Sequence, residues 1–147
     1  MSGEPLQADK LPTMDIQHFN DLLAAARQQP EPQRLLLVFA GASLPAGATA
    51  EQRARFDAGE SGELAPLMCV DKDPGELQDF AALQAEAAAM GPAWALVFAA
   101  ALPGQGRQAP APAQVDAALQ RMVEAVKSGQ LAGMIPFDRQ GEAVQLG

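Results

Sequence analysis

The chain holds one thiol and one imidazole, the side chains most often used for nucleophilic and acid–base catalysis. Cys69 lies late in an apolar run, and His18 lies near the start of the first helical pattern. A cysteine nucleophile needs a neighbouring base and an electropositive setting, and the positive end of a helix dipole disfavours a protonated His18. We therefore expect a buried, unreactive Cys69 and an exposed or helix-capping His18. The Gly-x-Ser-x-Gly turn of serine hydrolases is absent, so the sequence predicts no catalytic residue.

A second candidate for chemistry is the segment in which Asp71 and Asp73 flank Lys72. Paired carboxylates can hold Mg²⁺ or act as acid and base. Asp73, however, precedes Pro74 and stands three residues before Glu76, which is the pattern of a helix N-cap. A capping Asp73 leaves only Asp71 available, so we expect a turn and a helix start here, and no metal.

A third candidate is Gly104-Gln105-Gly106, a fragment of a dinucleotide-binding loop. The pattern is incomplete because position 109, where the third glycine belongs, is Ala, and no P-loop pattern occurs. We expect residues 102–113 to form a long, mobile connection, rich in Gly and Pro, and we expect no cofactor.

Apolar periodicity places these residues on alternating elements. Helical patterns begin at Asp15, Thr49 and Asp73, and a fourth helix carries Val115 and Val126 on one face and ends at Gly129. Short apolar runs predict strands at 35–40, 64–70, 93–101, 134–137 and 143–146.

This alternation predicts an α/β fold. We expect a single three-layer domain over residues 15–147, with a mostly parallel sheet of about five strands, an N-terminal helix and a C-terminal antiparallel hairpin. Residues 1–14 are polar and contain two prolines, which indicates a flexible tail.

In an open parallel sheet, ligands bind outside the carboxyl ends of the strands. A small anionic or nucleotide-like ligand at those ends would meet glycine-rich backbone and charged side chains. The predicted ligand-binding residues are Ser43, Asp71, Lys72, Gln105 and Arg107.

The C-terminal hairpin offers a different kind of site. Gly141 suits the left-handed position of its turn, and the last strand is expected at a sheet edge, where unpaired backbone groups can recruit another chain. The predicted interface residues are Val144, Gln145 and Leu146.

Composition limits the classes of binding partner and the cellular location that we expect. The net charge of −8 and the dispersed basic residues disfavour nucleic acid and anionic membranes. The longest apolar stretch, Ala93 to Leu102, is about half of a bilayer span. A single cysteine fits a reducing compartment, and residues 1–14 lack an apolar signal core, so we expect a cytoplasmic protein.

Four blocks of the chain carry a family resemblance: Pro32 to Ala42, Pro66 to Lys72, Leu119 to Ala125 and Pro136 to Gly141. They resemble a small family of proteobacterial proteins, some of which carry the label ribonucleotide reductase subunit alpha. The resemblance runs from about Phe19 to the C-terminus. It implies a bacterial cytoplasmic setting and, by that label, a role associated with ribonucleotide reduction, but it brings no site residues.

Two functions remain open. The absence of a reactive cluster favours a non-catalytic module that binds a protein partner or self-associates. The alternative is an enzyme or ligand-binding protein with its site at the strand ends. A concave pocket lined by Asp71, Lys72 and Arg107 would favour the second, and an exposed apolar or edge surface would favour the first.

Overall fold

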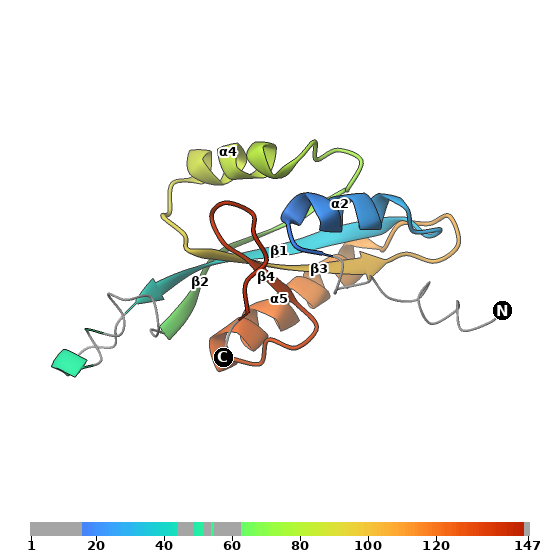
Figure 1. Ribbon diagram of the computed structural model, residues 1–147. Helices are drawn as coiled ribbons and strands as arrows, with labels where there is room; N and C mark the ends of the chain where they lie inside the picture. Colours follow the sequence, from blue (N-terminus) through green and yellow to red (C-terminus); the bar gives the residue numbers. More distant parts are fainter. Residues whose placement is uncertain (1–15, 44–48, 52–53, 55–62, 146–147) are drawn as a thin grey trace.

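A computed structural model of the chain describes residues 16–43, 49–51, 54 and 63–145 (Figure 1). Its sheet has four strands: β1 (Gln33–Ser43), β2 (Glu63–Lys72), β3 (Leu96–Pro103) and β4 (Ile135–Phe137). Their order is β2-β1-β3-β4, and every neighbouring pair is antiparallel.

The prediction of a mostly parallel sheet of five strands is therefore wrong. β1 lies between β2 and β3 and runs against both of them. Continuous apolar runs report that a strand is buried on both faces, and helices on both faces of an antiparallel sheet bury it equally well. The apolar pattern was a guide to burial and carried no information about strand direction.

Helices cover both faces of the sheet (Figure 1). α2 (Phe19–Arg27) and α4 (Phe80–Met90) lie on one face, and α5 (Pro112–Ser128) lies on the other. Alternate side chains of β1 serve the two layers: Leu35 and Phe39 pack in the core beneath α2 and α4, and Leu36 and Val38 pack in the core beneath α5. The predicted helix that begins at Thr49 falls mostly outside the described residues.

His18 caps α2, one of its two expected roles. Its Nδ1 accepts a hydrogen bond from the backbone N–H of Asn20 at 3.0 Å, and the Asp21 carboxylate accepts one from the backbone N–H of His18 at 3.1 Å. This reciprocal arrangement satisfies N–H groups that have no partner inside the helix. Asp15, the expected cap, lies outside the described residues.

The helix expected to begin at Asp73 begins later. Asp73 accepts from the backbone N–H of Gly75 at 2.8 Å within a turn, and Asp79 caps α4 by accepting from the N–H of Ala82 at 2.9 Å. The Arg27 guanidinium donates to the carbonyls of Pro74, Leu77 and Gln78. These bonds stabilise a turn in this segment in place of a continuous helix.

The C-terminal turn at Gly141 is confirmed, but the strand predicted at 143–146 is reduced to an isolated bridge at Ala143, and Leu146 lies outside the described residues. Gly141 has a φ of +83°, and its N–H donates to the carbonyl of Asp138 at 3.0 Å. Beyond the turn, Ala143 pairs with Phe137 on one side and donates its N–H to the carbonyl of Gln17 at 2.8 Å on the other. This segment is thus covered on both sides at Ala143.

Candidate functional site

Four of the five predicted ligand-binding residues lie at one end of the sheet. Because β2 and β3 both run against β1, their carboxyl ends meet beside the start of β1: Leu35 pairs with Lys72, and Gln33 pairs with Pro103. Asp71, Lys72, Gln105 and Arg107 belong to this end. Ser43 belongs to the opposite end, since it pairs with Glu63.

Asp71 and Lys72 do not converge on a common site. The Asp71 carboxylate accepts from Arg34 Nε at 2.6 Å, and both side chains are about one third exposed, at 32% and 33%. The next residue points to the other face of the strand, where Lys72 forms an ion pair with Glu86 of α4. Each charge is neutralised by a partner from its own chain, so neither is available as an unpaired acid or base.

An open cleft of about 470 Å³ lies at the same end of the sheet. Its walls come from the α2–β1 connection, the turn after β2 and the stretch before α5. Arg27, one of the lining residues, is occupied by backbone carbonyls, and Asp73 holds its turn. The lining residues are Ala26, Arg27, Gln29, Pro30, Glu31, Pro32, Gln33, Arg34, Asp73, Pro74, Gly75, Arg107 and Ala109.

Of the arginines that line the cleft, Arg107 is the one whose side chain does not bind another part of the described structure. It is exposed, and its guanidinium makes no hydrogen bond or ion pair with any described residue. It is presented by a tight turn in which Gln105 and Gln108 exchange both backbone hydrogen bonds, at 2.9 and 2.8 Å. A guanidinium held in this way is the kind of group that binds a carboxylate or a phosphate.

Cys69 is exposed, and the prediction that it is buried is wrong. The apolar run around it predicted burial, but β2 is an edge strand. Its side chains alternate between half-buried residues, such as Met68 and Val70, and exposed ones, such as Leu67 and Cys69. His18, bound at Nδ1 as a cap and at Nε2 to the carbonyl of Gln140, does not act on this thiol.

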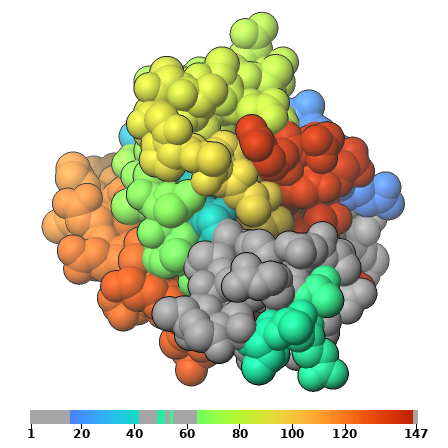
Figure 2. Space-filling model, turned by 90° about the vertical axis from the view of Figure 1, so that its left-hand side faces the viewer, coloured from blue at the N-terminus to red at the C-terminus, as the bar shows by residue number. Residues whose placement is uncertain are grey.

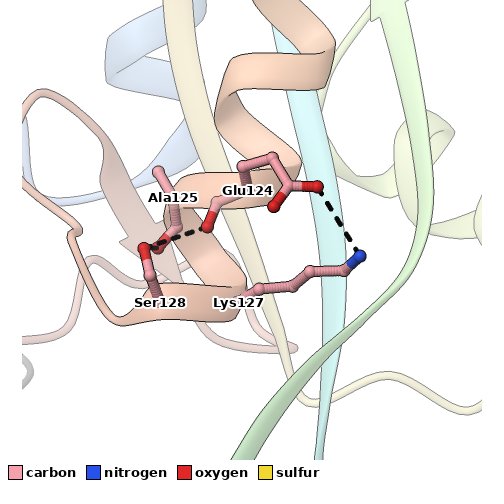
Figure 3. Close-up of polar contacts among 4 residues, drawn as sticks. All are labelled: Glu124, Ala125, Lys127 and Ser128. Atoms are coloured by element: carbon pink, nitrogen blue, oxygen red, sulfur yellow. Dashed lines mark hydrogen bonds and ion pairs between the residues drawn. The ribbon is translucent and has the colours of Figure 1, made fainter.

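The outer face of α5 carries a second hollow, of about 700 Å³. Its polar groups serve the end of the helix (Figure 3): the Ser128 hydroxyl donates to the carbonyls of Glu124 and Ala125 at 3.0 and 3.3 Å, and Lys127 pairs with Glu124 at 3.6 Å. These contacts account for the positions of the Glu124, Lys127 and Ser128 side chains, so no ligand is needed to explain them.

The edge of β2 is the other conspicuous feature. In Figure 2, the green segment that includes β2 lies at the surface, between the yellow-green residues of α4 and the orange residues of α5. β2 pairs with β1 alone among the described residues. Leu67, which is 39% exposed, lies on this edge above Gly41 and near the backbone of Ala93. Leu67 and Met90 are the exposed large apolar side chains of the described chain.

Sequence reasoning missed three residues that shape this region: Arg27, Arg34 and Glu86. Each acts on a residue at least 14 positions away in the chain. No local pattern identifies such partners, because the pairing depends on the strand order and on which face each helix covers.

Other classes of site find no support in the residues described. Among them, no three His, Cys, Asp or Glu side chains lie close enough together to hold a metal ion. None of the described helices is both long enough and apolar enough to cross a bilayer.

Comparison of the chain with models of protein families, with curated proteins and with solved structures finds no match.

Proposed function

We propose that this protein is a non-catalytic module that binds a polypeptide by strand addition at the edge of β2. The observation that carries the proposal is a ten-residue edge strand whose outer side has no partner among the described residues. In strand addition, an extended segment pairs with such an edge through backbone hydrogen bonds, and neighbouring side chains give specificity.

The sequence of β2 supports this use. Proteins usually protect an open edge with charges, prolines or bulges. Leu64 to Val70 carries no charge, and Lys72 is paired with Glu86. The protection present is confined to the first half of the strand, where Pro66 stands next to a break in the register opposite Phe39 and Ala40. Met68 to Lys72 is therefore the half best suited to accept a strand.

The absence of a catalytic group among the described residues is consistent with a binding role. Cys69 has no neighbouring base, His18 is bound through both ring nitrogens, and the charges of Asp71 and Lys72 are paired. A bacterial cytoplasmic setting belongs to the same proposal, supported by the single cysteine and by the family resemblance.

The test uses the single cysteine of the chain. A benzophenone maleimide attached to Cys69 and activated by light should form an adduct with one defined segment of a partner, located by mass spectrometry. The matched control, Cys69→Ser with Ala132→Cys, carries the same probe in the exposed turn before β4, the strand at the opposite edge of the sheet, and should form no such adduct. Adducts scattered over many proteins, or equal adducts from both positions, would rule out a docking edge at β2.

The cleft supports a second candidate function, binding of a small anionic ligand. The observation in its favour is the unpaired guanidinium of Arg107 at a concave surface. Pyrophosphate, citrate and ribonucleoside diphosphates are suitable probes, the last because of the label in the resembling family. A rise in melting temperature that is lost in Arg107→Gln would support this function, and no rise with any probe would exclude these three classes.

A further inference from the structure

From Leu64 to Lys72, the charges along the β2 edge are neutralised within one molecule. Asp71 is paired with Arg34 and Lys72 with Glu86, and the run from Leu64 to Val70 is uncharged. Along this described part of the strand, a charged partner segment would find no unpaired opposite charge. Two copies of a chain with a net charge of −8 repel each other, and they can approach most easily where the local charge is zero, as it is along this edge.

The alternation of β2 also leaves room beside the strand. Cys69 shares a face with Asp71, on the side where Arg34 and the α5 core lie, yet Cys69 is exposed. α5 therefore does not cover the edge at this position. Leu67, which the break in register leaves without a direct partner on β1, is partly exposed above Gly41.

From these observations we infer that the strand that docks on β2 is the β2 strand of a second copy, in antiparallel orientation. This inference rests on the proposed function and names its partner. A two-fold axis perpendicular to the sheet joins two four-stranded sheets into one continuous sheet, and such isologous pairing is the commonest symmetry of soluble oligomers.

The sequence of β2 limits where the axis can lie. An axis at Asp71 or Lys72 places like charges directly opposite each other, which destabilises the pair. An axis near Pro66 meets a residue without an N–H, next to the break in register. The axis therefore lies between Met68 and Val70. In each of these registers, Cys69 lies within two residues of Cys69 of the other copy, on the same face of the joined sheet.

Because one strand pair makes a small interface, the dimer is expected to be weak and to depend on concentration. A short bismaleimide, to which each Cys69 thiol adds, should link two copies of the native chain in a concentrated solution. Leu67→Glu adds a carboxylate near the axis, where each register brings it close to the added carboxylate of the other copy or to the Asp71 or Asp73 carboxylate of that copy, so the yield of linked dimer should fall at least tenfold. Ala132→Glu adds the same charge in the exposed turn before β4, away from β2, and should leave the yield unchanged.

Sedimentation of the unlinked proteins completes the test. The wild type should shift from monomer toward dimer as its concentration rises, and Leu67→Glu, with an unchanged melting temperature, should remain monomeric. A wild type that stays monomeric at its highest soluble concentration, or a dimer that persists in Leu67→Glu, would overturn the inference. If the wild type is monomeric while the Cys69 photoprobe still marks a segment of another protein, the second copy is excluded and strand addition at β2 stands.

Discussion

Single residues fix the C-terminal turn against the start of α2. A Cβ atom on Gly141 would lie 2.7 Å from Nε2 of His18 and 2.9 Å from a ring carbon of Phe80, and its φ of +83° already disfavours a side chain. We expect Gly141→Ala to lower the free energy of unfolding by about 2 kcal/mol or more, from backbone strain plus displaced side chains. Chemical denaturation measures this loss.

Gly133 is the matched control for Gly141. Its φ is similar, at +87°, but nothing lies within 4 Å of an added Cβ. Gly133→Ala should therefore cost only the backbone strain, about 1 kcal/mol. Equal losses in the two variants would show that the contacts with His18 and Phe80 do not hold Gly141.

Arg27 stabilises the turn that follows β2. Its guanidinium donates to three backbone carbonyls, with Nε to the Pro74 oxygen at 2.9 Å. In Arg27→Met these partly buried acceptors lose a charged donor, which should cost about 2 kcal/mol. Arg34→Met, which breaks an ion pair that is about one third exposed, should cost about 0.5 kcal/mol. A larger loss in Arg34→Met than in Arg27→Met, measured by denaturation, would contradict this ranking.

The elements themselves were largely readable from the sequence. The apolar face of α5, with Val115, Leu119 and Val126 buried, and its end at Gly129 follow directly from helical periodicity and a left-handed cap. The start of α4 could not be predicted, because a good local N-cap at Asp73 was overridden by Arg27, which lies 47 residues from Pro74. Local patterns determine helical faces, and tertiary contacts determine where this helix begins.

The start of α4 can be tested with two caps. Asp79→Ala removes the bond to the N–H of Ala82 and should lower the free energy of unfolding by about 1 kcal/mol. Asp73→Ala removes a bond within an exposed turn and should cost less than half as much. Denaturation curves of the two variants show which residue is the N-cap. A greater loss of unfolding free energy in Asp73→Ala would show that the helix begins at residue 73.

At the scale of the whole molecule, the direction of the strands could not be predicted from the pattern of apolar residues. Asp71, Lys72, Gln105 and Arg107 still share one end of the sheet, because β2 and β3 run the same way on either side of β1, but of these four residues only Arg107 lines the cleft there. Ser43 was predicted to lie with them only because the sheet was expected to be parallel. The exposure of Cys69 follows from the position of β2 at the edge, which Pro66 in this strand indicates, but the apolar run around Cys69 predicted burial.

Hydrogen exchange along β2 tests most directly whether this edge accepts a strand from another copy. In dilute solution, the β2 amides that are not bonded to β1 should exchange rapidly, and the alternate amides that are bonded to β1 should exchange slowly. Raising the protein concentration should slow the first set, while the amides of Ala143 and Val144, which donate within the chain, should not change. If every β2 amide is already protected in dilute solution, or if none responds to concentration, the edge does not act as a docking strand for a second copy.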